Sequence, residues 1–145
     1  MKVTRSYGCS RVINAPLEFV YAWCTDFRND DPNMTGNKNT RRILEKTKDR
    51  VVYAVDYTDE NSKGHVSVVT LKPPNGWHLD TAGNEQDIEV ADYKLTKLER
   101  NKTRLDIVFK ETYVGVKAPS AAALTAHVGE LWDKYIVHLM QDYGK

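Results

Sequence analysis

The chain has 145 residues, a length typical of one domain, and we expect a single ligand-binding domain over residues 1–145. It carries 21 Lys and Arg against 20 Asp and Glu, and a formal net charge of +1 gives no general attraction to nucleic acid. No apolar run approaches the roughly 18 residues of a membrane span, and Met1 to Arg5 contain no apolar signal core, so we expect a cytoplasmic protein without stable membrane insertion.

The N-terminal segment predicts a strand that runs directly into a short helix. Alternating residues end at Ile13, Pro16 has the fixed φ of a first helical turn, and Glu18 favours the helix N-terminus. From Leu17 to Cys24 every residue except Glu18 is apolar or aromatic, which predicts a helix that is buried on most of its surface. Cys24 and the earlier Cys9 are expected to be reduced thiols.

The segment from Arg28 to Asn39 is polar and rich in turn-forming residues, and it is compatible with a second short helix or with a loop. Within it, Asp31 to Asn39 place oxygen-bearing side chains at alternate positions, as an EF-hand calcium loop does. The match then fails, because Arg42 stands where a bidentate Glu belongs. We therefore expect a polar surface loop and no bound metal.

Strand signals follow without a helical period, separated by turns such as Lys72 to Gly76. The six predicted strands are Arg41 to Lys46, Val51 to Thr58, Gly64 to Leu71, Trp77 to Thr81, Ile88 to Leu98 and Arg104 to Val114. With the N-terminal strand they make seven.

The period changes at Pro119, where a long amphipathic helix is predicted to run to Asp142. Antiparallel strands followed by one such helix imply a curved sheet wrapped around it. Small residues are concentrated in the first half of the helix, and we expect them to leave one end of the trough hollow; they are Ala121, Ala122, Ala123, Ala126 and Gly129.

The string Asn14 to Tyr21 and the exit Thr25 to Phe27 resemble the start of the START-like superfamily, also called SRPBCC or helix-grip. This superfamily includes polyketide cyclases and dehydrases, lipid-transport domains and the birch-pollen-allergen group. The resemblance implies an α+β helix-grip fold: a seven-stranded antiparallel curved sheet wrapped around a long C-terminal helix, with two short helices after strand 1. It implies an internal cavity for a small hydrophobic ligand. No catalytic residue and no cofactor can be carried over from it.

Aromatic side chains on the predicted strands supply the candidate ligand-binding site, since they combine large apolar area with hydroxyls that need a partner. The proposed lining is Tyr53, Tyr57, Trp77, Tyr93, Tyr113, His127 and Leu131. Glu111 and Asp92 would join it only if strand register turns them inward. His65, at the start of a strand, is expected at the surface.

Three functions remain open. The first is binding or transport of a small hydrophobic or amphipathic molecule, such as a lipid, polyketide or isoprenoid-like compound. The second is a polyketide cyclase or dehydratase in which His127, a Tyr or Glu111 moves a proton. The third is a protein-interaction module of the chaperone-activator kind. The sequence indicates no oligomeric state, and it contains no nucleophile elbow, phosphate-binding loop or dinucleotide fingerprint.

Overall fold

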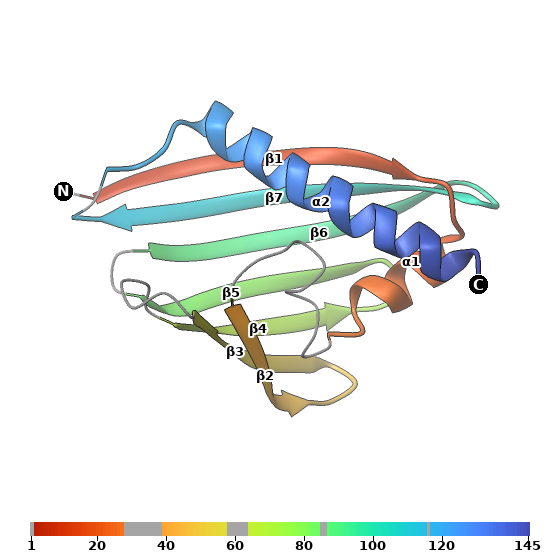
Figure 1. Ribbon diagram of the computed structural model, residues 1–145, viewed down its shortest axis with the longest axis horizontal. Coiled ribbons are helices and arrows are strands. Elements are labelled where there is room, and N and C mark those ends of the chain that lie inside the picture. Colours follow the sequence, from red (N-terminus) through yellow and green to blue (C-terminus); the bar gives the residue numbers. More distant parts are fainter. Residues whose placement is uncertain (1, 28–38, 58–63, 85–86, 116) are drawn as a thin grey trace.

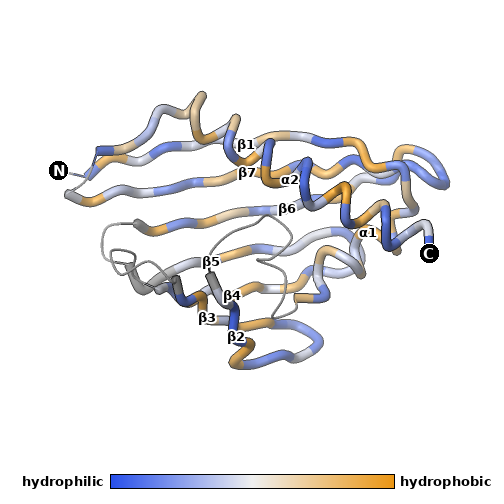
Figure 2. Tube along the Cα trace, viewed as in Figure 1, coloured by the Kyte–Doolittle hydropathy of each residue, from blue (hydrophilic) through white to orange (hydrophobic). Residues whose placement is uncertain are grey.

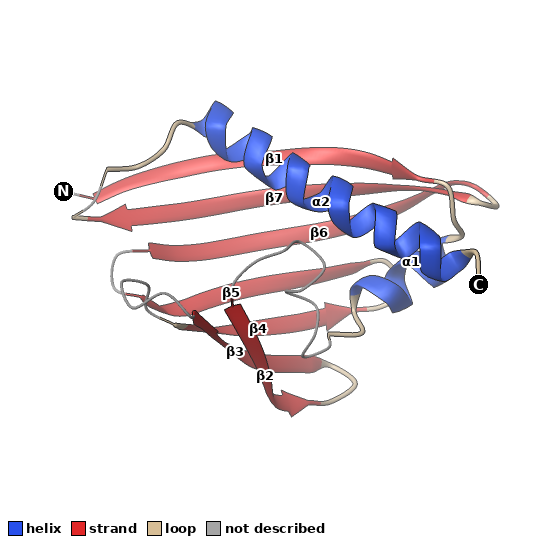
Figure 3. Cartoon of the chain, in the orientation of Figure 1, coloured by secondary structure: helices blue, strands red, loops and turns tan. Residues whose placement is uncertain are grey.

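The computed structural model describes residues 2–27, 39–57, 64–84, 87–115 and 117–145. Seven strands and two helices occur in these parts of the chain (Figure 3). In chain order they are β1 (Lys2–Ile13), α1 (Leu17–Cys24), β2 (Asn39–Lys46), β3 (Arg50–Tyr57), β4 (His65–Lys72), β5 (Gly76–Asn84), β6 (Asp87–Glu99), β7 (Lys102–Val114) and α2 (Ala121–Tyr143).

The strands form one antiparallel sheet in the order β1-β7-β6-β5-β4-β3-β2, with β1 and β2 at its edges. Every pair of neighbours except β1 and β7 is consecutive in the chain, so hairpins build the sheet and β1 closes it from the other end of the sequence. The predicted helix-grip architecture is confirmed, including the short helix after strand 1. The second short helix and the calcium-like loop were predicted for residues that lie outside the described part of the chain.

Alternation along the strands separates a buried face from an exposed one. In β7 the odd-numbered residues from Thr103 to Tyr113 are all buried, whereas the residues between them are exposed or half-buried. Figure 2 shows the same alternation of apolar and polar residues along several strands. The buried face carries the core, which includes Ile13, Val20 and Leu105.

α2 lies across the buried face of the sheet and packs mainly against β1 (Figure 1). The helix begins after Ser120, whose Oγ accepts a hydrogen bond of 3.1 Å from the backbone N–H of Ala123, a standard N-cap. It ends at Tyr143, before Gly144, one residue beyond the predicted end. Among the described residues, no helix has the length and apolar composition required to cross a membrane.

Three polar contacts hold α2 along its length. At the start, Arg5 Nε donates to the Pro119 carbonyl oxygen over 2.9 Å. In the middle, Arg11 Nε donates to Asp133 over 2.7 Å. At the end, Trp23 Nε1 of α1 donates to the carboxylate of Asp142, 2.8 Å away.

The small residues of α2 do not roof a hollow, contrary to the prediction from sequence. Residues 121–123, in the first turn of α2, are exposed. Ala126 is exposed because the rotation of 100° per residue puts it on the opposite side of the helix from Leu124 and Val128. Gly129 is buried, but it faces the Arg11 guanidinium: an added Cβ would lie 2.5 Å from one terminal nitrogen of Arg11. Larger residues of α2 face the cavity described below.

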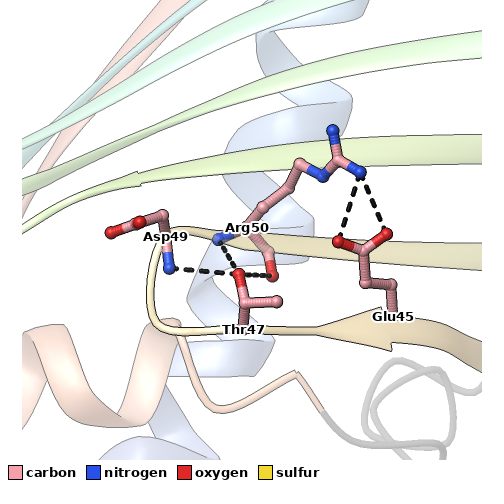
Figure 4. A network of polar contacts seen from close by, with 4 residues as sticks. All are labelled: Glu45, Thr47, Asp49 and Arg50. Carbon is pink, nitrogen blue, oxygen red and sulfur yellow. Dashed lines mark hydrogen bonds and ion pairs between the residues drawn. The ribbon is translucent and has the colours of Figure 1, made fainter.

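A compact polar network fixes the turn between β2 and β3 (Figure 4). The Thr47 hydroxyl accepts hydrogen bonds from the backbone N–H groups of Asp49 and Arg50, at 3.3 and 3.1 Å. The Arg50 guanidinium reaches both carboxylate oxygens of Glu45, at 2.9 and 3.2 Å. These contacts tie the end of β2 to the start of β3.

Candidate ligand-binding cavity

A cavity of about 620 Å³, partly open to solvent, lies between the buried face of the sheet and the two helices. Its wall combines aromatic, aliphatic and charged side chains. The lining residues are Tyr7, Trp23, Cys24, Phe27, Arg41, Tyr53, Val55, His65, Val69, Trp77, Leu79, Glu89, Tyr93, Phe109, Glu111, Tyr113, Leu124, His127, Val128, Leu131, Trp132 and Tyr135.

One end of the cavity is aromatic. Trp77 and Tyr93 are opposite each other on β5 and β6, and their rings stack with centroids 4.8 Å apart and an interplanar angle of 9°. Trp132 of α2 lies 5.9 Å from the Tyr93 ring, and Tyr21 of α1 meets the Trp77 ring edge-on at 6.2 Å. The two helices thus close this end with aromatic side chains, which favours contact with an apolar or planar group.

The strand register places a polar row farther along the same face. Glu111 of β7 is opposite Glu89 of β6, which is opposite Thr81 of β5; Thr81 is opposite Ser67 of β4, and Ser67 is opposite Tyr53 of β3. The hydroxyls of Ser67 and Thr81 are 2.9 Å apart and hydrogen-bonded. Buried polar groups need hydrogen-bond partners. This row therefore places several hydrogen-bonding side chains beside the cavity.

Glu111 is the most buried carboxylate of the described residues, with 5% of its surface exposed. The Tyr7 hydroxyl donates to Glu111 Oε2 over 3.4 Å. The Tyr7 ring in turn stacks on Phe109, with centroids 5.1 Å apart and an interplanar angle of 5°. A hydroxyl and a carboxylate are therefore held together at the cavity wall by packing from β1 and β7.

A cationic group borders the cavity on the opposite side, at the β2 edge. The guanidinium carbon of Arg41 lies 4.3 Å from the centroid of the Tyr53 ring and 5.8 Å from that of Phe27. Such contacts hold a guanidinium by cation–π attraction. Arg41 and His65 are both opposite Val55, on β2 and β4 respectively, so the guanidinium and the imidazole lie in one row across the sheet.

His65 lines the cavity, and the expectation of a surface position was wrong. Its strand starts with the side chain on the buried face, a fact of register that the sequence alone does not settle. Burial lowers the pKa of the His65 imidazole, and the nearby Arg41 charge lowers it further. The imidazole is therefore neutral at pH 7 and can both donate and accept a hydrogen bond.

The Tyr93 hydroxyl stays protonated well above neutral pH. Burial raises the pKa of Tyr93 well above its ordinary value, and the Glu89 charge adds to the effect. The influence of Glu89 on Tyr93 is consistent with both side chains facing the same cavity. Tyr93 therefore offers a hydrogen-bond donor between the aromatic and the polar end.

Six of the seven predicted lining residues border the cavity: Tyr53, Trp77, Tyr93, Tyr113, His127 and Leu131. His127 is one of them although the residue is exposed. Tyr57 is the last residue of β3, and its side chain lies outside the described part of the structure. That these residues contact a ligand remains a prediction.

The sequence did not decide whether Glu111 and Asp92 face the cavity, and the structure places them on opposite faces of the sheet. Glu111 faces the cavity, whereas Asp92 lies on the outer face, where its Oδ1 is 2.7 Å from Nδ1 of His78. The alternation of β7 already puts Glu111 on the same face as Phe109 and Tyr113.

Other lining residues were missed, notably Tyr7, Arg41, Glu89 and Trp132. Trp132 belongs to the apolar stripe of α2, but Arg41 and Glu89 carry no local signal of burial, because only the pairing with β3 and β7 shows which face they occupy. Among the described residues, no group of three or more His, Cys, Asp or Glu side chains is arranged to hold a metal ion.

No model of a known protein family matches the chain, and no curated protein does. Solved structures match closely in shape. The Zhui aromatase/cyclase from Streptomyces sp. R1128 has a TM-score of 0.70 at 13% identity, covering 97% of this chain and 93% of its own. Norcoclaurine synthase from Thalictrum flavum, in complex with dopamine and hydroxybenzaldehyde, has a TM-score of 0.71 at 6% identity, covering 97% and 88%.

Ara h 8.0201 is similar as well, with a TM-score of 0.69 at 8% identity and coverage of 96% of this chain and 99% of its own. At such low identities these likenesses show the fold alone. The chain has the helix-grip fold, and the fold implied by the resemblance of the N-terminal segment is confirmed.

Proposed function

We propose that this chain is a single domain, residues 1–145, that binds or transports a small hydrophobic or amphipathic molecule of the lipid, polyketide or isoprenoid-like kind. The cavity of about 620 Å³ between the sheet and α2 is the observation that carries the proposal. Small-molecule sites have volumes of about 300–1,000 Å³ and are lined mostly by apolar and aromatic side chains with a few polar groups. The balanced charge supports a protein without a nucleic-acid partner, and we place it in the cytoplasm.

The distribution of polarity supports an amphipathic ligand over a purely apolar one. Trp77 and Tyr93 line one end, whereas Glu111 and Glu89 line the other. A wholly apolar ligand would remove water from around the two carboxylates, and desolvation of a charged group costs free energy. A ligand with one apolar and one polar end avoids that cost.

A second candidate is an enzyme of the cyclase or dehydratase kind. The Tyr7 hydroxyl and the Glu111 carboxylate are hydrogen-bonded at the cavity wall, and such a pair can transfer protons to a bound molecule. The likeness in fold to an aromatase/cyclase supports this reading. The third alternative, a protein-interaction module, calls for a filled core, and the cavity argues against it.

The neutral dye N-phenyl-1-naphthylamine, whose fluorescence rises in apolar surroundings, tests the proposal. We expect saturable binding to the wild type and weaker binding to Leu131→Trp, because Leu131 lines the cavity and the larger ring would occupy part of it. Ala126→Trp is the matched control, since Ala126 is on the same helix and exposed. The proposal is wrong if the dye does not bind the wild type, or if a folded Leu131→Trp binds it as well as Ala126→Trp does.

A further inference from the structure

The ring of Tyr93 is held by three other aromatic rings, each from a different element. Trp77 of β5 stacks on it at 4.8 Å and 9°, and Phe109 of β7 meets it edge-on, with centroids 6.0 Å apart and an interplanar angle of 76°. Trp132 of α2 lies 5.9 Å away. Contacts of this kind fix the position of the ring, and with it the position of the hydroxyl at its tip.

The Tyr93 hydroxyl is a hydrogen-bonding group that the described parts of the chain leave unused. The Tyr7 hydroxyl, by contrast, donates to Glu111. Within the described ranges no hydrogen bond joins the Tyr93 hydroxyl to another group of the protein, and its oxygen is not closed off from solvent. Because Tyr93 lines the cavity, this hydroxyl is available to a molecule bound there.

The hydroxyl acts as a donor at neutral pH. Burial raises the pKa of Tyr93 well above its ordinary value, so the group keeps its proton. A phenol oxygen shares its lone pairs with the ring and accepts hydrogen bonds poorly. The ligand group that suits Tyr93 is therefore an acceptor, and a donor that meets no acceptor after losing water costs free energy.

Among neutral acceptors, a carbonyl oxygen fits this place better than an alcohol. A carbonyl accepts and donates nothing, so it satisfies the Tyr93 hydroxyl without adding a further demand. An alcohol oxygen also accepts, but its own O–H then needs an acceptor. The side chains in contact with the Tyr93 ring are aromatic, namely Trp77, Phe109 and Trp132, and they offer no oxygen for that purpose.

We propose that the ligand is an aromatic ketone whose carbonyl oxygen accepts a hydrogen bond from the Tyr93 hydroxyl, while its planar ring lies against Trp132 at the aromatic end of the cavity. This inference rests on the proposed function, since it requires that the cavity holds a ligand. It adds the chemical class of the ligand and makes Tyr93 the residue that selects that class.

Three probes that share a naphthalene ring test the inference by displacement of N-phenyl-1-naphthylamine at pH 7. They are 2-acetylnaphthalene, a ketone; 1-(2-naphthyl)ethanol, the alcohol with the same carbon skeleton; and 2-ethylnaphthalene, the hydrocarbon. One net hydrogen bond between neutral groups corresponds to roughly a two- to tenfold change in affinity. We expect the ketone to bind more tightly than the alcohol by about threefold or more.

Removal of one hydroxyl locates the effect. Tyr93→Phe keeps the ring, and it should weaken ketone binding about two- to tenfold while leaving the affinity for the hydrocarbon unchanged. Loss of packing around residue 93 would weaken both probes alike, so the ratio of the two affinities separates a hydrogen bond from a structural effect. Tyr143→Phe is the matched control, because Tyr143 is 37% exposed and lies outside the cavity lining, and it should change neither affinity.

The carbonyl stretch of bound 2-acetylnaphthalene gives an independent signature. Infrared difference spectra of the ketone with and without ¹³C at the carbonyl carbon isolate this band, which moves to lower frequency when the oxygen accepts a hydrogen bond. We expect a lower frequency in the wild type than in Tyr93→Phe. A wild-type band at the frequency found in an alkane solvent would overturn the inference even if Tyr93→Phe does not fold.

The outcomes separate this inference from the function on which it rests. If neither the dye nor any naphthalene probe binds the wild type, the proposed function itself fails. If the dye binds but the ketone has no advantage over the alcohol, or Tyr93→Phe weakens ketone and hydrocarbon equally, only the assignment of an aromatic ketone is overturned.

Discussion

Trp23 and Asp142 join the two helices across 119 positions of sequence: Nε1 of the indole donates to the carboxylate over 2.8 Å. Beside this bond the rings of Phe19 and Tyr143 are in contact, with centroids 4.9 Å apart. The short α1 is thereby fastened to the last turn of α2. Together they close the aromatic end of the cavity.

We expect the bond between Trp23 and Asp142 to contribute measurably to stability. A hydrogen bond to a charged group contributes about 1.5–3 kcal/mol. The double-mutant cycle of Trp23→Phe and Asp142→Ala, followed by urea unfolding, should give a coupling free energy near the lower part of that range, because the pair is only part-buried. A coupling indistinguishable from zero would contradict the expected contribution to stability.

The fully buried Thr103 connects β7 to the turn before α1. Its hydroxyl donates to the carbonyl oxygen of Ala15 over 2.8 Å, and none of the Thr103 surface is exposed. Thr103→Val should lower the free energy of unfolding by about 1–3 kcal/mol, since the carbonyl would lose its partner in a site closed to water. Thr103→Ser retains the hydroxyl and should lose less in the same urea titration; an equal loss in both would attribute the effect to packing.

His78 on the outer face should make stability depend on pH. Its ring lies 2.7 Å from Asp92 and 3.2 Å from Asp80, and the hydrogen bond to Asp92, followed by that to Asp80, raises the pKa of the imidazole above its ordinary value. A raised pKa in the folded state gives stability that is fully present below about pH 6.5, the ordinary value, and is lost as pH rises through the folded value.

His78→Gln should therefore be less stable than the wild type at pH 5.5, and the difference should shrink by pH 8.5. The carboxylates are 62% and 56% exposed, so the effect should stay below about 1 kcal/mol. Asp92→Asn should remove most of the same pH dependence. Unfolding curves of the three proteins at both pH values provide the measurement, and a gap that widens toward pH 8.5 would reverse the sign argued here.

Gly8 of β1 faces the backbone of β7, and a side chain there has no room. An added Cβ would lie 3.2 Å from the carbonyl carbon of Ile107 and closer still to its oxygen, both backbone atoms. Gly8→Ala should cost about 3 kcal/mol or more, because the two strands would have to separate. Gly144→Ala, with its nearest contact at an ordinary 3.5 Å, should be tolerated; similar melting temperatures for both variants would contradict the argument.

The order of elements was predictable because periodicity is a local property of the sequence. Alternation defined the strands, and the stripe through Leu124 and Leu139 defined α2. The strands observed at β5 and β7 are longer than predicted, starting at Gly76 and Lys102, since propensity weakens at strand ends where pairing still continues.

The site was less predictable because it depends on which face each strand presents. Trp77 and Tyr93 were identified as large aromatics in strands, which are usually buried. Glu89 and His65 could not be identified as lining residues, because polar residues in strands are usually exposed. Only the pairing across the sheet shows that they face the cavity. The error at Ala126 has a related cause: the small residues of α2 were considered for their size, whereas their angle around the helix decided their position.

The packing of α2 mainly against one edge of the sheet has a kinetic consequence. The helix rests on the edge strand β1 and is held by polar contacts at Pro119, Asp133 and Asp142, whereas the sheet beneath is joined by continuous backbone ladders. Cooperative units of a protein open at different free energies, and those with fewer apolar contacts open first. Amide hydrogens of α2 should therefore exchange with deuterium before those of β6 and β7. If the cavity binds a small molecule as proposed, the rate of its release should follow this partial opening and not global unfolding.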